Sequence, residues 1–406
     1  MKLLFDVKVP NRQNRSPRID IPMTHFKGPE GQEDMPYLLT PGPITTSRGV
    51  KFAMLADWGS RDSEFVSLVQ NLNSDLKTLA GCDSNYECVF MQGSGTTGIE
   101  AALGTLSPAK RKKTLVASNG VYGQRAVQIM ERIGRNHVAL NKSELKPLKP
   151  EDIAKAMDED RNITHVWMVH CETSTGVVNP MSEIASVVKS RGRIMMVDAM
   201  SSFGARPISM VTDNIDVMVS SPNKCLEAIP GFSFVFAKRD LLMAAQGASP
   251  SLVLDLFDQW QKFEATGQFR FTPPTHALVA LAQALRELHE EGGVDGRGQR
   301  YRATANAFNT RMKALGFSML LSSTDSGPIV QTVLSPADPK FNFKTFYSKL
   351  RAKGFAIYPS VLTRFESFRV GMIGQVDEKL IIQLISAIES VMADMDVRSF
   401  APARDS

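Results

Sequence analysis

The sequence predicts an α/β fold in which a mostly parallel sheet is covered by helices on both faces. Between residues 88 and 238, short β-rich runs alternate with stretches of helical periodicity. This alternation is typical of parallel sheets that are buried on both faces. After residue 269 the order of elements changes, which predicts a smaller α+β domain at the end of the chain.

The expected elements follow one another along the chain. In the first part, strand-length apolar runs occupy residues 88–92, 114–120, 165–170, 194–199, 216–221 and 232–238. Helical stretches follow the first three runs, at residues 96–106, 122–134 and 182–192. In the last part, helices are expected at residues 275–291, 343–354 and 378–395, with strands at residues 329–334, 355–359 and 367–374.

These elements divide the chain into three regions. Residues 1–36 are polar, with scattered basic residues, prolines and little periodicity, so we expect an N-terminal arm outside the core. Residues 37–269 should form the large α/β domain, and residues 270–406 the small C-terminal α+β domain.

Composition and charge exclude several classes of function. With 43% hydrophobic and 22% charged residues, the 406-residue chain is typical of a globular protein, and no apolar run reaches the roughly 20 residues of a membrane span. The net charge is +5, and the basic residues are interspersed with acidic ones. This pattern favours a small anionic ligand over nucleic acid. Four cysteines without metal-ligand spacing predict neither a metal site nor disulfides. The start lacks a secretory signal, so the cytoplasm is expected.

Candidate binding residues come directly after the strands, where sheets of this class bind ligands. The run "QGSGTTG", Gln92 to Gly98, opens a helix and presents backbone N–H groups to an anion such as phosphate. Many strand-to-helix turns contain glycine, so this run alone does not identify a site. Tyr122 lies in a glycine-flanked turn after the next strand, where its ring either contacts a ligand or packs in the core.

Two charged residues follow apolar strands in the same way. A carboxylate at the end of a buried strand, such as Asp198, needs a cationic or hydrogen-bonding partner, unless it caps a helix. Lys224, in "SSPNKCLEAIPGF", follows the next strand. Desolvation there would lower the pKa of the lysine and leave a free, nucleophilic amine, whereas a solvated surface lysine would not be activated.

Taken together, these four features match the requirements of pyridoxal 5′-phosphate. A glycine-rich turn suits its phosphate, an aromatic ring can stack on its pyridine, an acid can keep the ring nitrogen protonated, and a lysine can attach to its aldehyde. The sequence therefore predicts an enzyme that uses this cofactor.

The motifs also resemble those of a known family. The runs "LLTPGPITTS", "QGSGTTGIEAALG", "SNGVYGQR", "MVHCETSTGVVNP", "VDAMSSFGA", "NKCLEAIPGF", "RFTPPTHAL" and "SFRVGMIG" resemble the class V aminotransferases, which have the type I fold of pyridoxal-phosphate enzymes. The resemblance runs from about Tyr37 to the C-terminal helix. It is closest to the branch that transfers the amino group of 2-aminoethylphosphonate to pyruvate, giving phosphonoacetaldehyde and alanine.

The resemblance implies a role for individual residues. Lys224 would bind the cofactor covalently and move the proton in catalysis, Asp198 would pair with the pyridine nitrogen, and Arg369 would bind the acidic end of the substrate. The remaining cofactor contacts would come from Ser94, Gly95, Thr96, Tyr122, Thr173 and Asn223. Thr272 and Thr275 would complete the phosphate site of a neighbouring subunit, which implies a homodimer with sites at the interface.

Some segments differ from that branch and leave other reactions open. The run "DWGSRDSEF" replaces a more aromatic and acidic one, and Met372, Glu227 and Ala228 replace other residues, all expected near the substrate entrance. Arg61 or Glu227 could assist loss of a hydroxyl, as in related ammonia-lyases that act on 1-hydroxy-2-aminoethylphosphonate, or could simply form ion pairs. A transaminase of alanine or serine with glyoxylate is a further alternative.

Overall fold

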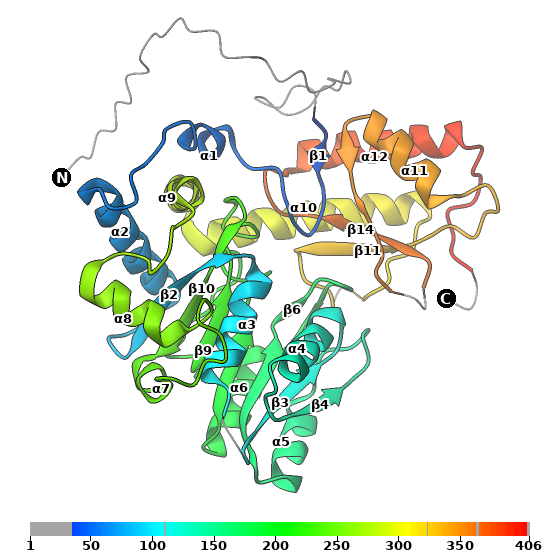
Figure 1. Ribbon diagram of the computed structural model, residues 1–406. Helices are drawn as coiled ribbons and strands as arrows, with labels where there is room; N and C mark the ends of the chain where they lie inside the picture. The colour runs from blue at the N-terminus through cyan, green and yellow to red at the C-terminus, as the bar shows by residue number, and fades with distance from the viewer. Residues whose placement is uncertain (1–34, 109–110, 323, 363–364, 404–406) are drawn as a thin grey trace, which may run out of the picture.

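A seven-stranded sheet forms the centre of the molecule (Figure 1). The computed structural model describes residues 35–108, 111–322, 324–362 and 365–403. The strands lie in the order β2-β10-β9-β8-β5-β3-β4, and β10 is antiparallel to both neighbours while the other pairs are parallel. Their bounds are Tyr86–Gly93 (β2), Gly231–Lys238 (β10), Val217–Ser220 (β9), Ile194–Asp198 (β8), Ile163–Val169 (β5), Lys113–Ser118 (β3) and His137–Asn141 (β4). The predicted mostly parallel sheet is therefore confirmed.

Helices cover both faces of this sheet because successive strand residues point to opposite sides. In β5, Val166 and Met168 join one apolar cluster, whereas Trp167 between them joins another. The first cluster is completed by helices α2 (Ser63–Leu79), α5 (Pro150–Glu159), α6 (Met181–Ser190) and α9 (Thr275–Glu290). The second is completed by α3 (Gly95–Leu106), α4 (Val121–Arg132), α7 (Arg239–Ala244) and α8 (Leu256–Thr266).

A smaller antiparallel sheet lies beside the large one (Figure 1). Its strands are β11 (Val330–Leu334), β14 (Ser367–Gly371) and β13 (Tyr358–Pro359), in that order. Helices α10 (Gly293–Leu315), α11 (Phe343–Ala352) and α12 (Glu378–Asp394) bury a separate apolar cluster against it. The start of the described chain joins this part, since β1 (Tyr37–Leu38) pairs with β12 (Phe355–Ala356).

The predicted domain limits remain predictions. Residues 1–34 of the expected N-terminal arm lie outside the described residues. Helix α9 begins after the expected boundary between residues 269 and 270, yet its apolar side chains pack in the cluster of the large sheet. Helix α10 contacts both α9 and α12, and so connects the two parts (Figure 1).

Several shorter or less regular elements complete the described structure. They include α1 (Arg48–Ala53) and the hairpin of β6 (Cys171–Glu172) and β7 (Val177–Val178). Within the described ranges, no helix is both long and apolar enough to cross a membrane.

Phe234 provides a test of the core of the large sheet. Its ring is fully buried. The centroid of this ring lies 5.8 Å from that of the Phe203 ring and 5.6 Å from that of the Phe236 ring. We expect Phe234→Ala to lower the free energy of unfolding by about 3–5 kcal/mol, because it leaves a cavity among packed rings. Urea denaturation followed by circular dichroism measures the change. Met243→Ala, at a side chain that is 57% exposed, should change stability by less than about 0.5 kcal/mol. Equal effects of the two substitutions would contradict this packing.

Candidate active site

The ends of several strands of the large sheet open into one cavity of about 180 Å³. Seven of the residues predicted from the sequence line it: Gly95, Thr96, Tyr122, Thr173, Asp198, Asn223 and Lys224. The other lining residues are Ile99, Arg125, Val169, Cys171, Met200, Ser201 and Ser221. The predicted residues Ser94, Thr272, Thr275 and Arg369 do not line the cavity of this single chain.

Helix α3 begins at the cavity wall. Ser94 is its N-cap, and its hydroxyl accepts a hydrogen bond from the Thr97 N–H at 3.4 Å, while Thr97 Oγ1 accepts from the Ser94 N–H at 3.0 Å. This reciprocal pair explains where the helix starts. Gly95 and Thr96 occupy the first turn, whose N–H groups have no partner within the helix and favour an anion. A Cβ at Gly95 would lie 2.5 Å from the sulfur of Met200, so a side chain here would require the Met200 side chain to move.

Asp198 is buried in this cavity, and Lys224 is half-buried there. Burial raises the pKa of Asp198 to about 7, although the Met200 N–H donates to its Oδ1 at 2.9 Å. Burial also lowers the pKa of Lys224 to about 8, and each group favours the charged form of the other. No helix begins after Asp198, so the helix-cap interpretation is wrong, and Lys224 is not a solvated surface lysine. Near neutral pH both groups can exchange protons.

The segment that follows β1 covers the lysine. The amine of Lys224 donates to the carbonyl oxygen of Pro41. Gly42 has a φ of 127°, which is unfavourable for residues with a side chain, and a Cβ there would overlap the lysine amine. The glycine therefore allows the backbone to lie directly against Lys224.

Glu172 orients the aromatic side of the cavity, a role that the sequence did not reveal. Helix α4 has Gly120 at its N-cap and no side-chain cap of its own. The buried carboxylate of Glu172 acts as the cap instead. It accepts hydrogen bonds from the N–H of Tyr122 at 3.1 Å and from the hydroxyl of Ser174 at 2.6 Å. Burial raises the pKa of Glu172, whereas these hydrogen bonds favour its charged form. Glu172 therefore fixes the turns that carry Tyr122 and Thr173.

Arg369 reaches the edge of the site from the smaller sheet. It lies on β14, and its guanidinium donates to the backbone carbonyls of Thr173 at 3.0 Å and Pro359 at 3.2 Å. Burial lowers its pKa, and the neighbouring Tyr122 opposes that effect. The contact with Thr173 places Arg369 against the cavity wall.

The two predicted threonines lie apart from the cavity of their own chain. The carbonyl oxygen of Thr272 accepts from Gln92 Nε2 at 3.1 Å, and Thr275 is the first residue of α9.

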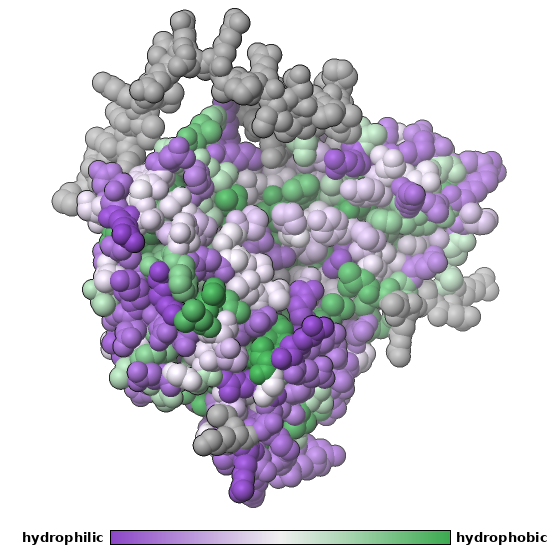
Figure 2. Space-filling model, in the orientation of Figure 1, coloured by the Kyte–Doolittle hydropathy of each residue, from purple (hydrophilic) through white to green (hydrophobic). Residues whose placement is uncertain are grey.

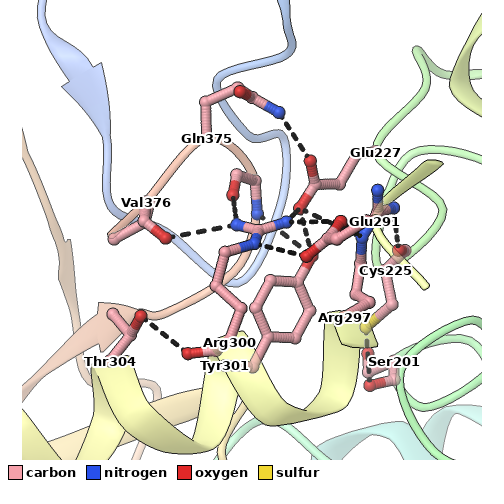
Figure 3. A network of polar contacts seen from close by, with 11 residues as sticks. Ser201, Cys225, Glu227, Glu291, Arg297, Arg300, Tyr301, Thr304, Gln375 and Val376 are labelled. Atoms are coloured by element: carbon pink, nitrogen blue, oxygen red, sulfur yellow. Dashed lines mark hydrogen bonds and ion pairs between the residues drawn. The ribbon is translucent and has the colours of Figure 1, made fainter. Parts of the chain in front are cut away.

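Glu227, Ala228 and Met372, which we expect near the substrate entrance, do not line the cavity. Met372 and Ala228 are buried in apolar clusters. The buried carboxylate of Glu227 lies in an ion-pair network, which Figure 3 shows around Arg300 of α10. The apolar surroundings of Met372 and Ala228 account for the apolar side chains at these positions. The ion pairs with Arg297 and Arg300 account for the carboxylate of Glu227.

The network joins the lysine turn to the smaller sheet. Glu227 accepts from Arg300 at 2.6 Å and from Gln375 Nε2 at 2.8 Å, just beyond β14 (Figure 3). Arg297 donates to the carbonyl oxygen of Cys225 at 2.9 Å and, with Arg300, binds Glu291. Two arginines and two glutamates thus balance their charges, which offsets the cost of burying them.

The segment "DWGSRDSEF", residues 57–65, also departs from the family pattern, and its side chains differ in exposure. Arg61 is exposed and does not line the cavity, whereas Trp58 is half-buried with its ring 6.3 Å from that of Phe65. Nothing in the cavity explains the charge of Arg61.

Comparison with known proteins identifies the class to which this fold and site belong. Residues 56–350 match the family model described as "Aminotransferase class-V". The chain therefore belongs to the class V aminotransferase family, and the resemblance predicted from its motifs is confirmed.

Similar proteins with curated names extend the comparison. The chain is 46% identical over 368 residues to the "2-aminoethylphosphonate--pyruvate transaminase" of Rhizobium meliloti (strain 1021), covering 90% of this chain and 96% of that protein. It is 47% identical over 339 residues to the protein of the same name from Burkholderia thailandensis, covering 84% and 92%.

Solved structures confirm the fold. The ureidoglycine-glyoxylate aminotransferase of Bacillus subtilis matches with a TM-score of 0.82 at 23% identity, covering 89% of this chain and 94% of the other. The pyridoxamine-pyruvate aminotransferase of Mesorhizobium loti matches with a TM-score of 0.81 at 23% identity, covering 90% and 94%. The predicted type I fold is thus confirmed.

The pKa of Lys224 can be tested through stability. In the ligand-free protein, its lowered pKa means that the folded state binds fewer protons than the unfolded chain between pH 8 and pH 10.5. The cost of burying the charged amine is complete below this window and disappears as the pH rises through it. Wild type should therefore gain roughly 3 kcal/mol relative to Lys224→Met across the window. Thermal denaturation at several pH values measures this gain. The control Lys155→Met, at an exposed site, should show the same dependence of stability on pH as wild type. If the stability difference between wild type and Lys224→Met does not change with pH, the lowered pKa of Lys224 is refuted.

The buried network predicts a large effect at Glu227. Glu227→Ala leaves the buried Arg297 and the half-buried Arg300 with one carboxylate between them, so we expect a loss of about 3–5 kcal/mol in stability. Differential scanning calorimetry measures it. Glu159→Ala removes an exposed pair with Lys155 and should cost less than about 0.5 kcal/mol. A loss at Glu227 no larger than at Glu159 would show that the network does not stabilise the fold.

Proposed function

We propose that the cavity binds pyridoxal 5′-phosphate and that the protein transfers the amino group of 2-aminoethylphosphonate to pyruvate, giving phosphonoacetaldehyde and alanine. The observation that carries this proposal is the burial of Asp198 and Lys224 in one cavity, beside the N-terminus of α3. Two curated relatives at 46% and 47% identity, named as transaminases of this substrate, support it.

The residues present fit the cofactor. A buried carboxylate whose pKa is raised to about 7 lacks a full countercharge, and a protonated pyridine nitrogen would supply one. When bound, the cofactor supplies an aldehyde for the lysine and a ring that withdraws electrons from the carbon beside the substrate amine. Gly95, Thr96 and Asn223 line the wall on which the phosphate would be held, with Ser94 fixing the start of the helix. The Tyr122 ring would stack on the pyridine, and Thr173 would bind near its hydroxyl.

Lys224 would act as the acid–base group. Its lowered pKa leaves a substantial neutral fraction of the amine near pH 8, so Nζ can accept a proton from the carbon that bears nitrogen and return it elsewhere. The Pro41 carbonyl holds Nζ in place from the other side.

Arg369 would bind the phosphonate. A planar guanidinium suits a phosphonate or carboxylate group because it donates two parallel hydrogen bonds. The backbone carbonyls of Thr173 and Pro359 fix its orientation, and it carries its charge into a largely buried environment. The substrate's acid end would therefore lie between the two sheets.

The proposed assembly is a homodimer in which a second copy completes the site. Thr272 and Thr275 lie outside the cavity of their own chain, which fits a contribution to the partner's phosphate site. Several large apolar side chains are exposed, including Phe52, Leu55, Leu252, Val253 and Phe271. Figure 2 shows separate apolar patches on one face of the molecule. A subunit interface would bury such surface.

Elimination of a hydroxyl has less support than transamination. Glu227, one of the two groups that suggested it, is occupied by Arg300 and Gln375 outside the cavity, and Arg61 is exposed. Neither is placed to assist a leaving group in this chain.

Three assays on the cofactor-loaded protein test the reaction. We expect alanine from 2-aminoethylphosphonate with pyruvate, no ammonia from 1-hydroxy-2-aminoethylphosphonate alone, and little glycine from alanine with glyoxylate. Lys224→Ala should reduce turnover by at least about 1,000-fold, because it removes both the covalent attachment and the base. Ammonia release without pyruvate would assign the protein to the lyases instead, and normal turnover by Lys224→Ala would exclude the proposed base.

A further inference from the structure

Arg125 lines the cavity and is the last residue of the run "SNGVYGQR", but no role was predicted for it from the sequence. It lies on α4 one turn after Tyr122, so the two side chains share a face of the helix. Its guanidinium carbon lies 4.9 Å from the centroid of the Tyr122 ring, and its Nη1 donates to Thr96 Oγ1 at 3.4 Å. Arg125 therefore connects the aromatic wall of the cavity to the first turn of α3.

The charge of Arg125 is not neutralised by a close ion pair. Across the described ranges, no carboxylate lies within 4.0 Å of its guanidinium. This contrasts with Arg297 and Arg300, which share Glu227 and Glu291. Asp198, the acid that lines the same cavity, is influenced by Arg125 only at longer range. A half-buried arginine that faces a cavity without a carboxylate leaves donors available to an anionic ligand.

The cavity as a whole favours an anion. It is lined by one acid, Asp198, and two bases, Lys224 and Arg125, and it also receives the N–H groups at the start of α3. Arginine remains charged at any relevant pH, so Arg125 supplies positive charge even when Lys224 is neutral. A guanidinium beside a helix N-terminus matches the oxygens of a phosphate or phosphonate group.

We infer that Arg125 is an anion-binding residue that donates hydrogen bonds to a phosphorus oxyanion in the cavity. This inference rests on the proposed function for its ligand, since either the phosphate of pyridoxal 5′-phosphate or the phosphonate of the substrate supplies that chemistry. The contact with Thr96 brings Arg125 to the start of α3, and its guanidinium lies over the Tyr122 ring in the same cavity.

Binding measurements on four proteins separate these sources. Wild type, Arg125→Met and Arg125→Lys are compared, with Arg132→Met as the matched control, since Arg132 lies on the same helix but is exposed and outside the cavity. Calorimetry on the cofactor-free protein compares pyridoxal 5′-phosphate with pyridoxal, which lacks the phosphate, and with inorganic phosphate. On the cofactor-loaded protein, unreactive ethylphosphonate is compared with propanoate.

We expect Arg125→Met to weaken binding of one phosphorus oxyanion roughly 10- to 100-fold, because a hydrogen bond from a charged donor is lost. Arg125→Lys should recover part of this affinity, and Arg132→Met should behave as wild type. If pyridoxal 5′-phosphate is weakened while pyridoxal is not, the ligand is the cofactor's phosphate. If ethylphosphonate alone is weakened, the ligand is the substrate's phosphonate. Either outcome supports the inference.

Two outcomes would overturn it. Equal weakening of pyridoxal and pyridoxal 5′-phosphate would mean that Arg125 only positions the Tyr122 ring. Unchanged affinities for all five ligands would mean that it binds no anion. Failure of the proposed reaction is distinguishable, because it would appear as absent alanine formation by wild type, whereas the inorganic phosphate measurement needs neither cofactor nor substrate.

Discussion

The structure around the site depends on burying an acid and an amine in one cavity. Asp198 and Lys224 lose hydration there, which raises the pKa of the acid and lowers that of the amine. Such burial is unfavourable unless neighbouring groups or a ligand compensate. It becomes possible because β8 and β9 are adjacent parallel strands whose carboxyl ends meet at the same edge of the sheet.

The surroundings of this pair are arranged by groups distant in the sequence. The Pro41 carbonyl accepts from the lysine amine, and the absence of a side chain at Gly42 allows that approach. Glu172 replaces the missing cap of α4 and so sets the position of Tyr122. Helices α3 and α4 thus both direct their N-termini to the cavity, one capped by its own serine and the other by a carboxylate from a different strand.

The ion-pair network behind the lysine couples the two sheets. Glu227 follows Lys224 by three residues and receives hydrogen bonds from α10 and from Gln375 beyond β14. Because β14 also carries Arg369, the network links the segment that holds the reactive amine to the strand that would bind the acid end of the substrate. A change in its charge balance would therefore affect both parts of the site.

The amino-acid sequence by itself determined the fold class and half of the residues that line the cavity. Apolar runs of strand length and helical periodicity are local properties, so the sheet, the strand ends and residues such as Asp198 and Lys224 could be predicted from it. Helix α10 was not predicted, because its glycines and arginines obscure the apolar pattern. Tertiary structure alone decided that Glu227 pairs with Arg300, that Glu172 caps α4 and that Arg125 contacts Thr96. Each of these depends on contacts between segments far apart in the chain or on the direction of one side chain, which local patterns do not encode.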